Sequence, residues 1–391
     1  MVRSFKFAST PEIIFGNGSF QQLPGLIGRY GSHMLLLTGA RSLRESPFFK
    51  TFTDNLKKNN FRYEVIGISE EPSPMLIDGL TSKFRRHMPD VVVSIGGGSV
   101  IDSGKAMSAM LPDLHSVYEY LEGVGTGKQH PGKKVPFIAV PTTSGTGSET
   151  TKNAVLSDVG KTGFKRSIRH DNFVPDIALI DPELTLSCPS NVTAACGMDA
   201  FTQLMESYVS LNASPFTDVL AFSGLEAAIR SLIRAYKNHS DLEARTGMSY
   251  AALVSGITLA NAGLGVVHGF ASVIGGYHNV PHGVICGTLL AESTKMNIST
   301  LLRKSPDSSA LEKYRKIGLL MMENNNGETG DPLDVLVNKL FEWTKELKIP
   351  KLGNFDIRER DLPHIIKETG IKQNPAELGN QELETIIRNR Y

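Results

Sequence analysis

Apolar and polar positions alternate in blocks along the first half of the chain. Short runs rich in Val, Ile and Leu are separated by amphipathic or charged segments, and glycine or proline follows most of these runs. Apolar runs bounded by turn residues predict buried strands, and the segments between them predict the helices of βαβ units. The expected strands are His33–Thr38, Tyr63–Ile66, Val91–Ile95, Val135–Val140 and Ile177–Ile180. The pattern therefore predicts an α/β domain with a parallel sheet covered on both faces.

The second half of the chain has a different pattern. After Cys188 the strand candidates stop, and apolar residues recur at the 3.6-residue spacing of helices. The clearest expected helices are Asp199–Tyr208, Ser223–Tyr236 and Pro332–Leu347. We therefore predict an N-terminal sheet domain over residues 1–185 and an all-helical domain over residues 186–391.

One stretch in the helical half carries no charge. Thr246–Ala291 contains no Asp, Glu, Lys or Arg over 46 residues, although 21% of the chain is charged. A membrane span is one explanation, but polar residues and glycines leave no clean apolar run of about 20 residues. A buried helix beside a functional pocket is the favoured explanation, because buried imidazoles need partners or a metal. Three of the ten histidines lie in this stretch, namely His268, His278 and His282.

Composition narrows the class of protein further. The chain has 391 residues, with 41 Lys and Arg against 40 Asp and Glu. A net charge of +1 gives no global field toward nucleic acid or a membrane, so neither partner is expected. The three cysteines form no CxxC pair, which argues against disulfides and against a cysteine-based zinc site. The N-terminus lacks the apolar run of a signal peptide, so a cytoplasmic protein is expected.

Two glycine-rich loops follow predicted strands. Val91–Ile95 runs into Gly96-Gly97-Gly98-Ser99 and then into a helical pattern, an arrangement that presents helix N–H groups to phosphate. Val135–Val140 runs into PTTSGTGSE, at Pro141–Glu149. A tight turn and a flexible linker are the alternative explanations. Because open α/β sheets bind ligands at the carboxyl ends of their strands, we favour one crevice for a pyrophosphate and a ribose.

Four polar residues of the helical half form a candidate metal site. Asp199 and Gln203 are four residues apart on a predicted helix, so their side chains share one face. Together with His268 and His282 they offer oxygen and imidazole ligands for Fe or Zn. A solvated Asp–Gln pair and hydrogen-bonded core histidines are the alternative, and spacing alone leaves both open.

Seven motifs occur in order: Phe15-Gly16, GGGSVIDSGKA (Gly96–Ala106), PTTSGTGSE (Pro141–Glu149), DPEL (Asp181–Leu184), GMDAFTQLMESYVS (Gly197–Ser210), GVVHGF (Gly265–Phe270) and PHGV (Pro281–Val284). Together they resemble the iron-containing, or group III, alcohol dehydrogenases over nearly the whole chain. The resemblance implies a Rossmann-like domain and a helical domain, as in the dehydroquinate synthase-like architecture. It also implies a nicotinamide cofactor and a metal in the cleft between them, and a dimer or larger homo-oligomer.

The resemblance also implies roles for individual residues. The cofactor would be bound by Gly96, Gly97, Gly98, Ser99, Asp102, Thr142, Thr143, Thr146, Asn153 and Lys165. The family's metal ligands are one Asp and three His, which match Asp199, His268 and His282. Gln203 stands where the family usually has the remaining His. Many relatives have another His where this chain has Ser272, so we consider His278 as the proton donor, with a wall residue as the alternative.

The residues after the first long predicted strand indicate whether the cofactor carries a 2′-phosphate on its ribose. Gly39 follows His33–Thr38, where NAD-dependent members of the family commonly have Asp. An acid at this place binds the ribose 2′-OH, whereas a small residue near Arg admits a 2′-phosphate. Arg41, Ser42 and Arg44 follow, so we favour NADP(H) over NAD(H) and include Gly39 and Ser42 in the cofactor site.

The expected activity is reversible hydride transfer between the nicotinamide and a small primary alcohol or aldehyde. Fe(II) or Zn(II) would stabilise charge on the substrate oxygen as a Lewis acid. Gln203 and Ser272 favour one alternative, a metal-independent reductase related to maleylacetate reductases. A sugar-phosphate cyclase of the dehydroquinate synthase type would need more Lys and Arg near the ligands. A non-catalytic NADP-binding protein is the remaining alternative.

Overall fold

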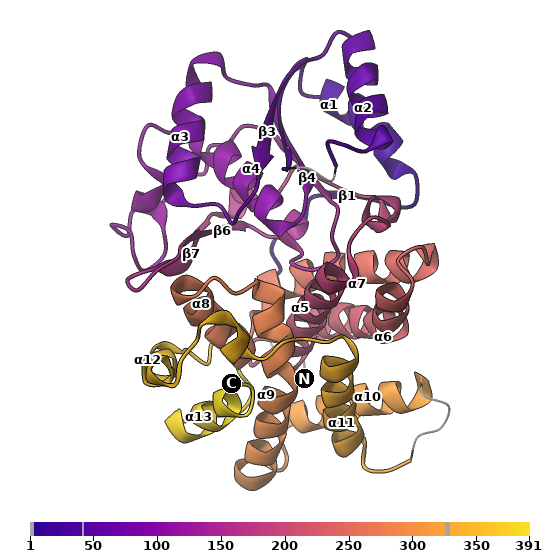
Figure 1. Ribbon diagram of the computed structural model, residues 1–391, viewed down its shortest axis with the longest axis vertical. Coiled ribbons are helices and arrows are strands. Elements are labelled where there is room, and N and C mark those ends of the chain that lie inside the picture. The colour runs from indigo at the N-terminus through magenta and orange to yellow at the C-terminus, as the bar shows by residue number, and fades with distance from the viewer. Residues whose placement is uncertain (1–3, 41–42, 325–328) are drawn as a thin grey trace.

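The chain folds into a sheet domain and a helical domain. The computed structural model describes residues 4–40, 43–324 and 329–391. Figure 1 shows the sheet domain above and the helical domain below, with the β6–β7 hairpin at their junction. The predicted α/β plus all-α fold is therefore confirmed.

The sheet has six parallel strands in the order β1-β8-β5-β4-β2-β3. Their bounds are β1 (Glu12–Phe15), β2 (His33–Gly39), β3 (Arg62–Ile68), β4 (Val91–Gly96), β5 (Phe137–Pro141) and β8 (Ile177–Ile180). Each of the five predicted strands overlaps an observed one. The sequence pattern missed β1, because four partly exposed residues at a sheet edge carry little periodic signal.

Helices cover both faces of this sheet. Their bounds are α1 (Leu23–Gly28), α2 (Pro47–Lys58), α3 (Pro74–Phe84) and α4 (Gly98–Met110). Along β2, Leu35 and Leu37 join the core under α3 and α4, whereas Met34 and Leu36 join the core under α1 and α2. Since successive side chains point to opposite faces, apolar residues at consecutive positions bury the strand on both sides.

An antiparallel hairpin that the sequence pattern did not predict projects from this domain. It pairs β6 (Asn153–Asp158) with β7 (Phe164–Arg169). Its strands mix polar, charged and apolar residues, so they lack the continuous apolar run by which buried strands are predicted. The turn reaches the helical domain, where the Gly160 N–H donates to the Gly276 carbonyl at 3.2 Å.

The second half of the chain is helical, as predicted. The helices are α5 (Ser190–Val209), α6 (Pro215–Lys237), α7 (Leu242–Ala262), α8 (Val266–Tyr277), α9 (His282–Lys304), α10 (Ser309–Asn324), α11 (Pro332–Glu346), α12 (Leu362–Glu368) and α13 (Asn380–Arg388). The last sheet strand ends at Ile180 and α5 begins at Ser190, with a short 3-10 turn over Pro182–Thr185 between them.

The charge-free stretch forms most of α7, all of α8 and the start of α9. Its apolar residues belong to the core of the helical domain, which accounts for the missing charges. Over the described residues, no single helix is both long and apolar enough to cross a membrane. Only α7 and α8 taken together pass that test, and the pair is bent by 99°.

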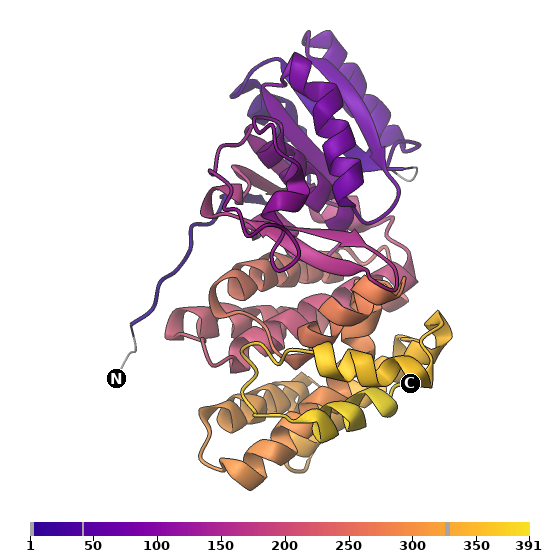
Figure 2. The ribbon, with the colours of Figure 1, turned by 90° about the vertical axis from the view of Figure 1, so that its left-hand side faces the viewer.

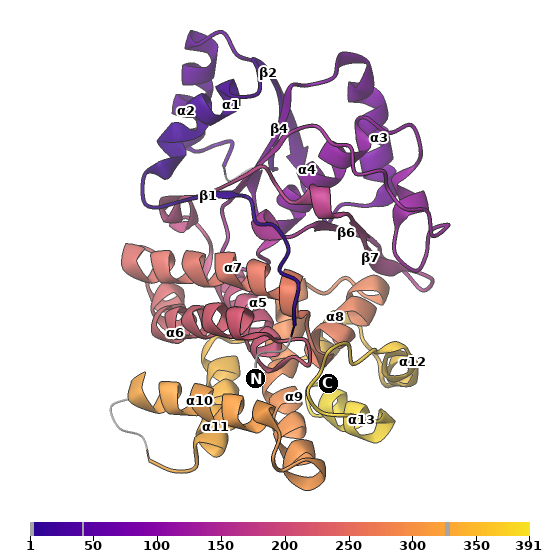
Figure 3. The same cartoon turned by 180° about the vertical axis from the view of Figure 1, so that it is seen from behind.

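The two domains meet through close backbone contacts. Gly147, in the loop after β5, has a φ of +63° and packs on Gly256 of α7, where an added β-carbon would lie 2.5 Å from the Gly256 Cα. The N-terminal segment runs from β1 toward the helical domain. Figure 2 shows its first described residues standing away from the side of the fold, and Figure 3 shows the segment passing in front of α7. There the Ala8 N–H donates to Asn261 Oδ1 at 2.6 Å.

Lys105 of α4 holds the loop after β5 and the start of β6 against the sheet domain. Its buried ammonium donates to the Ser148 carbonyl at 2.7 Å, and to Thr151 Oγ1 and the Asn153 carbonyl at 2.8 Å each. Burial lowers the pKa of Lys105 to about 8. Because this one ammonium donates its shortest hydrogen bonds to three acceptors, it fixes the elements that carry several predicted cofactor residues.

We predict that Lys105→Met destabilises the protein. Each buried acceptor left without a donor costs about 1–3 kcal/mol, so thermal unfolding should shift down by several degrees. Lys152→Met is the matched control, because Lys152 pairs with the largely exposed Asp171, and such pairs contribute about 0–1 kcal/mol. Equal melting temperatures for the two variants in calorimetry would contradict this role of Lys105.

Candidate active site

The glycines after β4 are required by their surroundings. An added β-carbon at Gly96 would lie 2.6 Å from the Val100 side chain, and one at Gly98 would lie 2.7 Å from Thr146 Cγ2. At Gly97 it would lie 3.3 Å from Thr143 Oγ1. The two glycine-rich loops therefore pack directly on each other at the N-terminus of α4, whose free N–H groups suit a phosphate.

Sheet register brings the two loops together. Gly96 at the end of β4 pairs with Pro141 at the end of β5. The next N–H, that of Thr142, donates to the Gly96 carbonyl at 3.0 Å. Because parallel strands end at one edge, the loops form a single surface, as the open-sheet rule predicts.

A cavity of about 230 Å³ lies between the domains. It brings together Gly98, Ser99, Asp102, Thr146, Asn153 and Lys165 of the predicted cofactor set and Gln203, His268 and His282 of the predicted metal set. Gly39, Gly96, Gly97, Thr142 and Thr143 do not line it. Ser42 lies outside the described residues.

One carboxylate oxygen of Asp102 lacks a hydrogen-bond donor among the described residues. The residue is buried, and its Oδ1 has no hydrogen-bond partner in the described parts of the chain. Burial raises the pKa of Asp102 to about 6. A buried orphan acceptor in the cavity beside the α4 N-terminus fits a hydroxyl or amide of a dinucleotide.

Gly39 lies at the carboxyl end of β2, next to β3. In the described parts of the chain, no atom lies within 4 Å of the position that a β-carbon would take there. A cation is close by. Gly67 of β3 pairs with Thr38, the residue before Gly39. The Arg44 guanidinium lies 3.1 Å from the position that a β-carbon would take at Gly67. This strand end therefore offers open space and positive charge, and the described residues place no acid at position 39 or 40.

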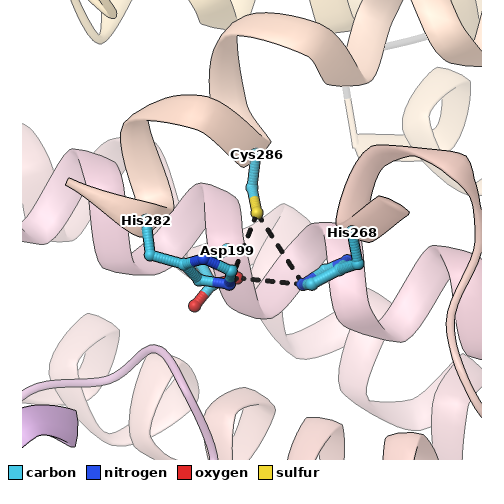
Figure 4. A group of neighbouring side chains, drawn as sticks. All are labelled: Asp199, His268, His282 and Cys286. Atoms are coloured by element: carbon cyan, nitrogen blue, oxygen red, sulfur yellow. Dashed lines mark hydrogen bonds and ion pairs between the residues drawn. The ribbon is translucent and has the colours of Figure 1, made fainter. Parts of the chain in front are cut away.

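Four donor atoms meet at the other end of the cavity (Figure 4). They belong to Asp199 of α5, His268 of α8, and His282 and Cys286 of α9, and all lie within 4.8 Å of one another. Asp199 Oδ1 is 3.4 Å from His268 Nε2 and 3.7 Å from His282 Nε2. Three helices thus place one carboxylate, two imidazoles and one thiol around a common point.

Glu206 fixes the orientation of His268. Its Oε2 is 2.7 Å from His268 Nδ1, and its Oε1 accepts the Val267 N–H at 2.7 Å. A proton on Nδ1 would satisfy this carboxylate, and Nε2, which faces Asp199, is then the nitrogen that a metal would bind. Glu206 is absent from the predicted set, although its position seven residues after Asp199 on the same face of α5 is a usable signal.

This donor set fits a divalent metal. Asp199 Oδ1 has no hydrogen-bond partner in the described residues and lies 3.4 Å from His268 Nε2. Burial lowers the pKa of His282 to about 4, which favours the neutral imidazole. Although burial opposes the effect, the nearby Cys286 and Glu206 raise the pKa of His268, so these groups favour a positive charge among them. A divalent metal bound by the deprotonated ligands would supply that charge.

Gln203 lines the cavity but is engaged elsewhere. It is buried, and its Oε1 accepts a hydrogen bond from the Ser255 hydroxyl at 2.8 Å. Cys286 lies inside the four-residue group, although the lack of a CxxC pair argued against cysteine ligands. The missed signal is the spacing His282-x-x-x-Cys286, which puts both side chains on one face of a helix.

His278 lies away from this group. It ends α8 and lines a different cavity, with Lys161, Tyr277, Arg360, Asp361, His364 and Ile365. Its Nε2 is 3.9 Å from Asp361 Oδ2. The structure does not bring it to the metal ligands, and its role as proton donor stays a prediction.

Comparisons with known proteins agree with this site. Residues 10–182 match the model of the iron-containing alcohol dehydrogenases, and residues 193–391 match the model of the C-terminal domain of that family. The chain belongs to the iron-containing alcohol dehydrogenase family. The resemblance seen in the motifs is therefore confirmed, and the chain is an NAD(P)-dependent oxidoreductase that acts on CH–OH groups.

Individual relatives differ in their cofactor. The chain is 31% identical to the NADPH-dependent butanol dehydrogenase of Clostridium saccharobutylicum, over 99% of this chain and 98% of that one. It is 27% identical to the NAD-dependent methanol dehydrogenase of Bacillus methanolicus, over 98% and 99%. The crystal structure of a 1,3-propanediol oxidoreductase superposes with a TM-score of 0.88 at 29% identity and covers all of both chains.

Proposed function

We propose that this iron-containing alcohol dehydrogenase family member uses NADP(H) to interconvert a small primary alcohol and its aldehyde in the interdomain cavity. The observation that carries the proposal is the composition of that cavity. Its sheet-domain wall has the N-terminus of α4 and the orphan carboxylate Asp102 for a dinucleotide. Its helical wall has His268 and His282 for a metal, so cofactor and metal would meet at one substrate.

Each wall contributes to the reaction through this chain's own residues. When bound, the metal supplies Lewis-acid stabilisation of charge on the substrate oxygen, and the nicotinamide supplies or accepts the hydride. Asp199, His268 and His282 hold the metal, and Glu206 keeps the His268 proton on Nδ1. Leu259 and Leu264 give the cavity an apolar side that limits water near the reacting carbon.

The proposal of NADP(H) rests on the end of β2. Gly39 gives a 2′-phosphate the space that an Asp side chain would fill, and Arg44 supplies positive charge near that strand end. The relatives include both NADPH-dependent and NAD-dependent enzymes, so the choice depends on this chain's own residues. A homo-oligomer and a cytoplasmic location stay predictions from the sequence.

We predict that Asp199→Ala abolishes metal-dependent aldehyde reduction. Loss of the one carboxylate in the group removes both a ligand and the charge that attracts a cation, so metal content should fall together with kcat. Asp334→Ala, at an exposed position of α11, is the control. Initial rates with NADPH and butanal, measured after chelation with and without added Fe(II) or Zn(II), decide the question. Undiminished turnover by Asp199→Ala would point instead to a metal-independent reductase.

We predict that Gly39→Asp shifts the cofactor preference toward NADH. The new β-carbon meets none of the described atoms within 4 Å, and the carboxylate beyond it would repel a 2′-phosphate and accept a hydrogen bond from the ribose 2′-OH. The ratio of kcat/KM for NADPH to that for NADH should fall by at least about 10-fold. A wild-type enzyme that prefers NADH, or a variant with an unchanged ratio, would contradict the proposed NADP(H) preference.

A further inference from the structure

Cys286 brings a fourth donor atom to the group of Asp199, His268 and His282. The thiol lies one helical turn after His282, with its Sγ 3.7 Å from His268 Nε2 and 3.8 Å from His282 Nε2. It is fully buried. Because the same three helices that hold Asp199 and the two histidines also fix this sulfur, its position is part of the site and does not depend on a flexible loop.

Gln203 is a poor fourth ligand by comparison. An amide oxygen carries no charge and binds borderline metals more weakly than imidazole or thiolate. Its Oε1 already accepts the Ser255 hydroxyl, so coordination would give up that buried hydrogen bond.

We propose that Cys286 is a metal ligand of this enzyme, so that its centre consists of one carboxylate, two imidazoles and one thiolate. The thiol loses its proton to solvent as the sulfur–metal bond forms. Two anionic ligands then neutralise the divalent cation, which favours the ion at a buried site. A thiolate beside imidazole and carboxylate would favour Zn(II) over the harder iron(II).

Cobalt substitution tests this ligand directly. Wild-type protein loaded with Co(II) should show the intense near-ultraviolet charge-transfer band of a thiolate–cobalt bond, and Cys286→Ser should lack it. Cys188→Ser is the matched control, because Cys188 is also largely buried but lies outside the metal group, next to Thr193 and Arg245. No band in the wild-type protein, or a band that survives Cys286→Ser, would overturn the proposal.

Metal affinity gives a second readout. Because changes around metal ligands commonly weaken binding 10–100-fold, loss of the sulfur itself should weaken Zn(II) binding by at least about 100-fold. Gln203→His in the Cys286→Ser background should recover affinity without recovering the cobalt band. Equal Zn(II) affinity for wild-type and Cys286→Ser protein would overturn the proposal. If Cys286→Ser fails to fold, cadmium NMR of the wild-type protein decides, since a sulfur ligand shifts the resonance strongly and its absence contradicts the proposal.

A separate observation concerns the substrate. Lys372 lines the same cavity, and its Nζ donates to Ser272 Oγ at 3.3 Å, one turn after His268 on α8. Among the described residues, no carboxylate forms an ion pair with Lys372. Arg169 of β7 adds a second cation to the cavity wall, although it also pairs with Glu122 at 2.9 Å.

The backbone holds Lys372 in place at an energetic cost. Its φ is 52°, in the left-handed region that non-glycine residues rarely adopt. The following residues anchor the turn, because the Gln373 N–H donates to the Leu264 carbonyl at 2.9 Å and Asn374 Nδ2 donates to Asn297 Oδ1 at 2.7 Å. Strained residues held by their surroundings concentrate at ligand-binding places.

We infer that the substrate carries an anionic group, such as a carboxylate or sulfonate, that binds Lys372 while its carbonyl lies beside His268 and His282 in the same cavity. This inference rests on the proposed function. The class is a short aldehyde with an anionic group a few bonds from the carbonyl, because Ser272 and Lys372 lie about one helical turn from the metal ligand His268.

Two aldehydes of equal length test this inference. Wild-type kcat/KM should be higher for succinic semialdehyde than for butanal. Lys372→Met should lower only the value for succinic semialdehyde, by about 10–100-fold, as for a lost charge-assisted hydrogen bond. Lys372→Arg should retain much of it, and Lys161→Met, at the other cavity, should change neither. Turnover of butanal alone would overturn this inference and leave the proposed function intact, whereas turnover of neither would contradict the proposed function.

Discussion

Four metal-ligating side chains that converge at one buried point are the feature on which this structure depends. Asp199, His268, His282 and Cys286 bring an oxygen, two nitrogens and a sulfur within 4.8 Å of one another, and Glu206 accepts a hydrogen bond from His268 Nδ1. A divalent cation among them would stabilise this buried arrangement, because it attracts every one of these donor atoms. The packing of α5, α8 and α9 therefore forms a cation site. The charge-free sequence of Thr246–Ala291, which includes α8 and the start of α9, follows from the burial of these helices in the core.

The rest of the fold positions a second wall opposite this group. Backbone contact between Gly147 and Gly256, and the buried ammonium of Lys105, keep the loop after β5 between the domains. The N-terminus of α4 and the orphan carboxylate of Asp102 then face the metal ligands across one cavity. The nicotinamide and the metal need this proximity, because the hydride is transferred at the carbon whose oxygen the metal would polarise.

The sequence predicted the parts that have a periodic or motif signal. Buried strands such as Val91–Gly96 are recognisable in the sequence as apolar runs. The glycine loops and Asp199, His268 and His282 match motifs of the family. The β6–β7 hairpin is partly polar and has no such period. The spacing of Cys286 four residues after His282 is a local signal, but it gains meaning only with the contacts to His268 and Asp199, which lie far away in the sequence. Lys372 lies near the C-terminus, and nothing in the residues around it indicates its contact with Ser272.

The proposed sulfur ligand of the metal site is measured most directly by X-ray absorption spectroscopy of the zinc-loaded wild-type enzyme. The account predicts a first shell with one sulfur at about 2.3 Å beside nitrogen and oxygen ligands at about 2.0–2.2 Å. A first shell that contains nitrogen and oxygen alone would contradict it and would return the fourth position to Gln203 or to solvent.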